Sequence, residues 1–240
     1  DGSFVYAWFA SGVSACYDLE GHRKWIRADN HDPVEHGFTT SPLLFEGKFI
    51  VYMRELMAFD AKTGKEVWRN SPAGKEGIYT YRFRSSFAAG YVGNVGVVMP
   101  ADGCLYKASD GQVLLKDPRT MGAGISTPVV DGGVEYKIST GNELCMLPLP
   151  AAPDAALNAA GLQGVKISMD QYPFYYMNCI LASPLVHDGL AYVLSNSGLL
   201  TVVDVKANAI VYQKMLDLGH LQGHNESAFR GIGVSPALAG

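Results

Sequence analysis

Ala58-Phe59-Asp60-Ala61-Lys62-Thr63-Gly64-Lys65-Glu66-Val67-Trp68 is the stretch of sequence that decides the fold. It reads as the end of an apolar strand, a turn carrying Asp and Gly, and a second strand with a bulky residue four positions after the glycine. The pattern recurs three times with other residues: Cys16 to Gly21 with Trp25, Tyr106 to Gly111 with Leu115, and Val203 to Asn208 with Tyr212. Asn208 stands where the other copies have glycine, which indicates a turn residue with positive φ.

A second short motif alternates with these copies: a Ser or Thr that in most cases precedes Pro. Its five occurrences are Ser41-Pro42, Ser86-Phe87, Thr127-Pro128, Ser183-Pro184 and Ser235-Pro236, at intervals of 45, 41, 56 and 52 residues. Each interval fits one four-stranded propeller blade of about 40 to 50 residues, with insertions in the longer two. The sequence therefore predicts an all-β fold, a β-propeller of four-stranded antiparallel blades.

The four strands of a blade, A to D, follow from the two motifs. Strand A starts near the Ser/Thr motif, turns at a pair such as Glu46-Gly47, Asp131-Gly132 or Asp188-Gly189, and returns as an apolar strand B. Strand C precedes the Asp/Gly turn, and strand D carries Trp or its substitute. The chain then begins at strand B of its first blade.

These motifs resemble the pyrroloquinoline-quinone (PQQ)-type repeat of quinoprotein dehydrogenases and their non-enzymatic relatives, with Ala58 to Trp68 as the best match. The resemblance spans nearly the whole chain and implies the quinoprotein alcohol dehydrogenase-like type of propeller. About five blades fit the length, whereas relatives with this repeat typically close with eight. We therefore expect a single domain, residues 1–240, incomplete at one or both ends and part of a larger seven- or eight-bladed propeller. Five blades that close by sharing terminal strands are the alternative.

Composition agrees with this fold. The 240 residues are 48% hydrophobic and include 27 glycines, enough for a sizeable core and many turns. The formal charge of −4 gives no reason to expect a nucleic acid partner. No apolar run reaches the roughly 20 residues of a transmembrane segment. The chain starts at Asp1, so a signal peptide cannot be judged from it.

The cysteines are interpreted as structural. Cys16, Cys104 and Cys145 fall in or beside strands C, and Cys179 lies near a strand A. They show no Cys-x-x-Cys spacing, so the sequence supports neither zinc nor a redox motif.

One segment departs from the blade plan, an insertion at about residues 148–172. Asp154 is placed to cap a short helix over residues 155–160 that ends at Gly161. We interpret it as a family-specific insertion rather than a catalytic element, and its Ala-rich face stays open as a docking surface.

The candidate binding surface lies in the connections from strand D to strand A, which converge around the mouth of the propeller channel. Its candidate residues are His31, His36, Tyr81, Arg82, Arg84, Tyr175, Tyr176, His220, His224 and Arg230. They suit a protein partner, or a small polar ligand or carbohydrate that aromatic walls would hold. Solvated loop polarity and core packing explain the same residues, and no third ligand completes a metal site at His31 and His36.

Two functions remain open at this point. The favoured one is a non-catalytic ligand- or protein-binding scaffold outside the cytoplasm, periplasmic or secreted, with no cofactor. The alternative is a dehydrogenase dependent on PQQ and Ca²⁺ that oxidises an alcohol or sugar. That family usually shows adjacent cysteines and a Trp below the quinone, whereas this chain has no adjacent cysteines and uses Trp25 and Trp68 in the repeat. A hydrolase or lyase that uses the loop histidines is a third, weaker interpretation.

Overall fold

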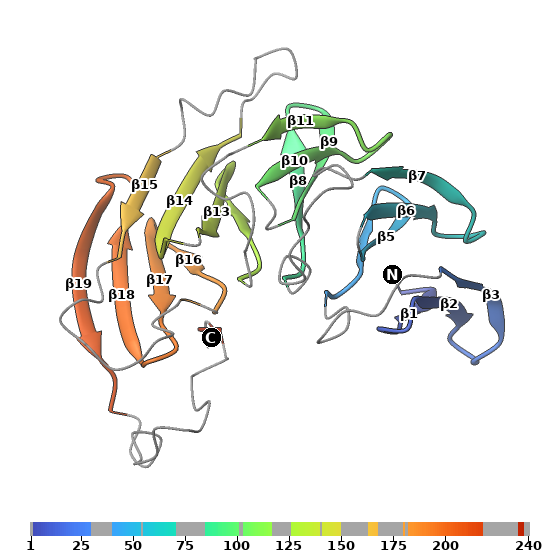
Figure 1. Ribbon diagram of the computed structural model, residues 1–240, viewed down its shortest axis with the longest axis horizontal. Coiled ribbons are helices and arrows are strands. Elements are labelled where there is room, and N and C mark those ends of the chain that lie inside the picture. The colour runs from blue at the N-terminus through green and yellow to red at the C-terminus, as the bar shows by residue number, and fades with distance from the viewer. Residues whose placement is uncertain are drawn as a thin grey trace.

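The structure is a computed structural model that describes residues 2–29, 40–53, 55–70, 85–100, 103–116, 126–139, 141–149, 163–167, 180, 182–217 and 235–237. All regular secondary structure in these ranges is β-strand, arranged in five antiparallel sheets. Figure 1 shows the sheets as blades that follow one another around an open arc. The prediction of an all-β propeller with about five blades is confirmed.

The blades are numbered in chain order. Blade 1 holds β1 (Phe4–Trp8), β2 (Val13–Asp18) and β3 (Arg23–Ala28). Blade 2 holds β4 (Leu43–Phe45), β5 (Lys48–Tyr52), β6 (Leu56–Asp60) and β7 (Glu66–Asn70). Blade 3 holds β8 (Ala88–Val92), β9 (Val95–Met99), β10 (Cys104–Lys107) and β11 (Val113–Lys116). Blade 4 holds β12 (Val129–Asp131), β13 (Val134–Ile138), β14 (Glu143–Pro148) and β15 (Gln163–Lys166). Blade 5 holds β16 (Leu185–His187), β17 (Leu190–Leu194), β18 (Leu199–Asp204) and β19 (Ala209–Met215).

Register identifies corresponding residues in different blades. Phe4 pairs with Asp18 in blade 1 as Lys48 pairs with Asp60 in blade 2, so β1 is a strand B. Blade 1 accordingly has three described strands and starts at strand B, as predicted.

The turns from strand A to strand B use the expected chemistry. Glu46 and Gly47 both have positive φ (48° and 70°), and so do Asp188 and Gly189 (49° and 75°), as a two-residue type I′ hairpin requires. In blade 4 the prediction is wrong by one residue: Asp131 still belongs to β12, and Gly132 and Gly133 form the turn. Asp131 pairs with Val134 across that turn.

The turns from strand C to strand D depend on the Asp and Gly of the repeat. Asp60 Oδ1 accepts hydrogen bonds from the backbone N–H (2.8 Å) and the hydroxyl (2.7 Å) of Thr63, which closes the turn. Gly64 then adopts φ 69°, and Asn208 adopts φ 53° at the corresponding place. The prediction that Asn208 serves as the positive-φ residue is confirmed.

We call the contact between two successive blades a seam. In seam 1–2 the indole N–H of Trp25 donates to the backbone oxygen of Ala61 (2.9 Å), and its ring lies on Gly64, where a Cβ would be 2.7 Å from Trp25 Cδ2. In seam 2–3 the indole of Trp68 donates to the backbone oxygen of Ala108 (2.9 Å). The Trp of the repeat therefore joins its blade to the next one.

The core continues through these seams. One cluster of buried residues extends over blades 1 to 3 and includes Phe49, which stacks on Tyr6 with ring centroids 5.5 Å apart. Phe49 thus faces blade 1, and Val51, two residues along β5, shares its face. Two further clusters join blade 3 to blade 4 and blade 4 to blade 5.

The predicted insertion at 148–172 contains part of a blade. Residues 163–166 form β15, the strand D of blade 4, which pairs with β14. The residues predicted to form a helix, 155–160, lie outside the described ranges.

The cysteines and hydropathy complete the account of the fold. Cys16, Cys104 and Cys145 are buried in strands C, as the structural interpretation predicts, while Cys179 lies outside the described ranges. Across the described ranges, no helix has the length and hydrophobicity needed to cross a membrane.

Candidate functional site

The ten candidate site residues all fall in segments outside the described ranges. These segments are 30–39, 71–84, 168–179 and 218–234, which lead from a strand D towards the next strand A or, in the last case, towards Ser235. The structure therefore does not place His31, His36, Tyr81, Arg82, Arg84, Tyr175, Tyr176, His220, His224 or Arg230, and their role stays a prediction. What it does describe is the framework to which these connections are attached.

The Ser/Thr motif forms this framework. The backbone N–H of Ser41 donates to Ser86 Oγ (2.9 Å), and that of Ser86 donates to Thr127 Oγ1 (3.3 Å). The N–H of Thr127 donates to Ser183 Oγ (3.0 Å), and that of Ser183 donates to Ser235 Oγ (2.9 Å). We call this series the hydroxyl chain. It links the start of each strand A to the start of the next.

The hydroxyl chain fixes where the D-to-A connections end. In an antiparallel blade, strand A starts on the side where strand D finishes, so all these connections reach the same side of the propeller. The A-to-B and C-to-D turns lie on the opposite side for the same reason. The five motif residues thus hold the ends of the candidate loops at one face.

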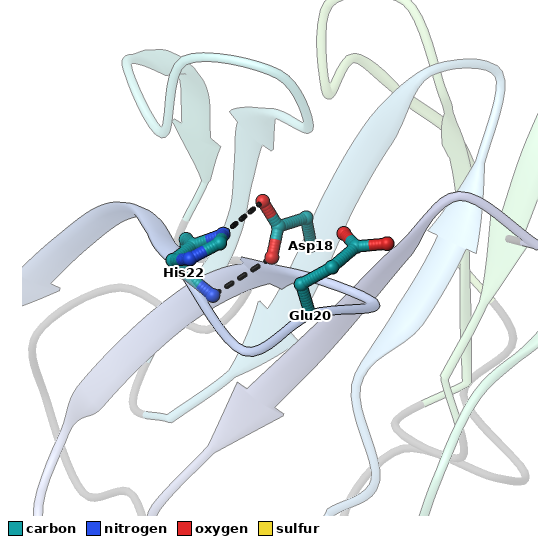
Figure 2. A group of neighbouring side chains, drawn as sticks. All are labelled: Asp18, Glu20 and His22. Carbon is teal, nitrogen blue, oxygen red and sulfur yellow. Dashed lines mark hydrogen bonds and ion pairs between the residues drawn. The ribbon is translucent and has the colours of Figure 1, made fainter.

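Asp18, Glu20 and His22 form the one group among the described residues whose ligand atoms are close enough for a metal ion, within 4.8 Å of one another. Figure 2 shows that both oxygens of the Asp18 carboxylate interact with His22. Oδ1 accepts a hydrogen bond from the backbone N–H of His22 (2.7 Å), and Oδ2 lies 3.1 Å from His22 Nδ1. Lys24 Nζ also contacts Oδ2, at 2.8 Å.

The Asp18 carboxylate of this group already has a cation as its partner, Lys24. The hydrogen bond from Lys24 is the largest cause that lowers the pKa of Asp18 to about 2, and the bonds from His22 add to it. His22 is largely exposed. The three residues cap the C-to-D turn of blade 1, on the side opposite the candidate loops, and we assign them no metal.

Glu135 and Lys137 form a buried ion pair that the sequence analysis missed. Lys137 Nζ lies 3.3 Å from Glu135 Oε2, and both side chains are almost fully buried. By register they correspond to Phe49 and Val51, so they face blade 3. Charged residues at i and i+2 on an otherwise apolar strand B, Val134-Glu135-Tyr136-Lys137-Ile138, were the available signal.

This pair lies inside a seam. Glu135 pairs across the sheet with Val130 and Leu147, and both of these pack with residues of blade 3. The pair therefore belongs to the packing of seam 3–4 rather than to an open site.

Comparison with known proteins agrees with the fold. Residues 52–149 match the family model described as outer membrane protein assembly factor BamB. This segment includes the best copy of the repeat, Ala58 to Trp68, and runs through blade 3 into blade 4. Architecture and match together define the class: the chain is a β-propeller of PQQ-like repeats.

Two solved structures share its arrangement of blades. BamB from Moraxella catarrhalis superposes with a TM-score of 0.60 at 17% sequence identity, over 90% of this chain and 62% of that chain. Kluyveromyces lactis Hsv2 superposes with a TM-score of 0.51 at 10% identity, over 89% of this chain and 60% of that chain. The chain thus spans about three fifths of the length of these structures. At these identities the likeness shows the fold, and no curated protein matches the sequence.

Proposed function

We propose that the chain is a non-catalytic scaffold that binds a protein partner through its D-to-A loops. The observation that carries the proposal is that the polar groups of the repeat form hydrogen bonds with other parts of the fold. The indoles of Trp25 and Trp68, the carboxylate of Asp60 and the hydroxyl chain all bind neighbouring backbone or side chains of the fold. What the framework offers to a partner is its set of loops, the usual position of function on a rigid scaffold.

The match to an outer membrane protein assembly factor supports this type of role. It favours a protein over a carbohydrate or another small ligand as partner, and a place outside the cytoplasm, periplasmic or secreted. The formal charge of −4 is unsuited to nucleic acid. We propose that the partner contacts several loops together, because the hydroxyl chain brings their ends to one face.

The proposal includes no cofactor. In a PQQ- and Ca²⁺-dependent dehydrogenase an indole would lie below the quinone, yet Trp25 and Trp68 lie between blades, with their rings on Gly64 and Gly111. These residues do not fit the quinone. A Trp that is buried in a seam and hydrogen-bonded to the next blade is not available as a platform in the channel mouth.

The first test is capture of the partner by photo-crosslinking in the cell envelope of the source organism. The wild-type chain is compared with the paired variants Tyr175→Ala/Tyr176→Ala and His220→Ala/His224→Ala. We expect each pair to lose the crosslinked protein while the melting temperature changes little, since exposed loop substitutions usually cost less than about 0.5 kcal/mol.

The matched control is Tyr91→Ala, an exposed tyrosine in the β8–β9 hairpin on the opposite face. It should retain the crosslink. Equal loss in Tyr91→Ala and in the loop variants would argue against the loop face. Saturable binding of PQQ that requires Ca²⁺, measured by calorimetry on the folded chain, would replace the scaffold with the dehydrogenase.

A further inference from the structure

Asn142 lies in a turn that recurs in three blades. In blades 1, 4 and 5 the turn from strand B to strand C occupies residues 9–12, 139–142 and 195–198. In each, the N–H of the last residue donates to the backbone oxygen of the first, at 2.9, 3.1 and 3.1 Å. The last residue has positive φ every time: Gly12 (87°), Asn142 (57°) and Gly198 (90°). Blade 4 therefore has a side chain at a position where blades 1 and 5 have glycine.

The backbone of this turn holds the start of the connection that follows strand D. The first residue after strand D donates its N–H to the backbone oxygen of the last turn residue: Asp29 to Gly12, Ile167 to Asn142 and Leu216 to Gly198, each at 3.0 Å. This bond needs no side chain. It fixes the point at which the chain leaves strand D in all three blades.

The side chain of Asn142 makes a second bond, which a glycine cannot make. Its Oδ1 accepts from the backbone N–H of Ile180 (3.1 Å), the residue that follows the segment 168–179. Ile167 and Ile180 are both buried in the cluster that joins blade 4 to blade 5. One residue therefore holds both the start and the end of the same D-to-A connection.

Blade 4 is built to accept this asparagine. A side chain at positive φ is strained, and Asn tolerates that conformation better than most residues. In blade 1 the position has no room for a side chain, because a Cβ on Gly12 would collide with the backbone oxygen of Asp29. The turn of blade 4 admits a side chain, and the bond from Ile180 offsets the strain that this side chain brings.

We propose that Asn142 is a positioning residue for the partner-binding face, because it holds the two ends of the connection that carries the candidate residues Tyr175 and Tyr176. This inference rests on the proposed function. A connection whose ends are already held in the free protein loses less conformational entropy when a partner binds it. Asn142 acts through Ile167 and Ile180 and has no need to touch the partner.

Asn142→Gly tests the bond with a small change, since glycine is the residue that blades 1 and 5 use. The turn and the bond from Ile167 require only backbone atoms and should persist, whereas the bond from Ile180 is lost. In hydrogen–deuterium exchange followed by NMR, we expect the Ile180 amide to exchange about tenfold faster and the Ile167 amide to keep its rate. Asn142→Asp retains a side-chain oxygen that can accept from Ile180 and should restore the slower exchange.

Photo-crosslinking in the cell envelope tests the effect on binding. The yield of crosslinked partner should fall about three- to tenfold in Asn142→Gly and recover in Asn142→Asp. The matched control is Asn208→Gly, the same substitution at a positive-φ asparagine (53°) in a C-to-D turn on the opposite face, and it should crosslink like wild type. The melting temperature should change little in all three variants, whereas a residue that only joined blades 4 and 5 would lower it when replaced.

The outcomes separate this inference from the proposed function. If Tyr175→Ala/Tyr176→Ala loses the crosslink while Asn142→Gly keeps it, the loop face stands and the positioning role is overturned. If every loop variant keeps the crosslink, the proposed function fails and the positioning role fails with it, even where the Ile180 amide exchanges faster. An unchanged exchange rate at Ile180, or a crosslink lost only together with a large fall in melting temperature, overturns the positioning role alone.

Discussion

Seams 1–2 and 2–3 differ in construction from seams 3–4 and 4–5. The first two are joined by Trp25 and Trp68, whose indoles bind the next blade. Seam 3–4 has Leu115 at that position, and blade 4 has Gln163 there, paired with Met146. Leu115 supplies apolar contact without a donor, and Gln163 is exposed. The hydroxyl chain crosses seams 2–3, 3–4 and 4–5, but an indole that binds the next blade is found, among the described residues, in seams 1–2 and 2–3.

Charged side chains are also arranged differently in seam 1–2 and seam 3–4. Seam 1–2 carries a network in which Arg27 lies 3.7 Å from the centroid of the Phe59 ring and donates to the backbone oxygen of Gly64 (2.9 Å). Arg69 of blade 2 reaches Asp29 of blade 1 at 3.6 Å. In seam 3–4 the charged pair Glu135 and Lys137 is contained within one strand and buried. Charged side chains therefore bind across seam 1–2, whereas the charged pair at seam 3–4 binds within its own strand.

Loss of a Trp should give the largest effect. We expect Trp68→Ala to lower the free energy of unfolding by about 4 kcal/mol, because it removes a buried ring and the hydrogen bond to Ala108. Leu115→Ala in seam 3–4 should cost about 2 kcal/mol. Urea denaturation followed by circular dichroism measures both. Trp68→Phe keeps a ring without the donor and should fall between them, and equal losses for Trp68→Ala and Leu115→Ala would remove the distinction between the seams.

Removing only the cation of the buried ion pair should lower stability almost as much as losing the Trp, whereas replacing both charged residues should change it little. Lys137→Met leaves the Glu135 carboxylate buried without its cation and should cost about 3 kcal/mol in urea denaturation. The double variant Glu135→Leu/Lys137→Met makes this strand resemble its counterparts in other blades and should lie within about 1 kcal/mol of wild type. If the double variant were as unstable as the single one, the pair would contribute more than charge balance.

The glycines offer a smaller, matched comparison. Gly111 and Gly21 both have positive φ (73° and 85°), so either one changed to Ala should cost about 1 kcal/mol of backbone strain. At Gly111 a Cβ would also lie 2.5 Å from Trp68 Cε3, whereas at Gly21 it meets nothing. Gly111→Ala should therefore lose about 1 kcal/mol more than Gly21→Ala, measured as the shift in urea midpoint. Identical midpoints would mean that the Trp68 ring moves aside without cost.

Acid should have the smallest effect. Hydrogen bonds from Lys24 and His22 lower the pKa of Asp18 to about 2, and bonds from Thr63 lower the pKa of Asp60. A carboxyl whose pKa is lower in the folded state stabilises the fold above its unfolded pKa, and this stabilisation is lost as the pH falls through the folded pKa. We expect the free energy of unfolding to decline from about pH 4 to about pH 2. Lys24→Met removes the main cause at Asp18 and should make this decline shallower in thermal melts, whereas an unchanged slope would exclude Asp18 as its source.

Much of the fold follows from the sequence, because the information is local. Alternating apolar residues, the Gly64-type turns and the spacing to Trp68 specify single blades and their order. The Ser/Thr motif was visible as a repeat, but its role was not, since each hydroxyl binds a residue in another blade, 41 to 56 positions away. β15 escaped detection for a similar reason: its sequence, Gln-Gly-Val-Lys, has no Trp, and it follows a long connection. The candidate site was placed on loops by topology alone, and its ten residues remain predictions.

Because of the hydroxyl chain, the geometry of the framework does not depend on the length of the loops. Its links span 45, 41, 56 and 52 residues, yet the four donor–acceptor distances stay between 2.9 and 3.3 Å. Insertions and deletions between two motif residues need not disturb the next blade, because each strand A is positioned by its neighbour and not by the preceding loop. A protein built in this way can exchange its connecting loops one at a time during evolution, and a designer could graft new ones between Ser41, Ser86, Thr127, Ser183 and Ser235 on the same principle.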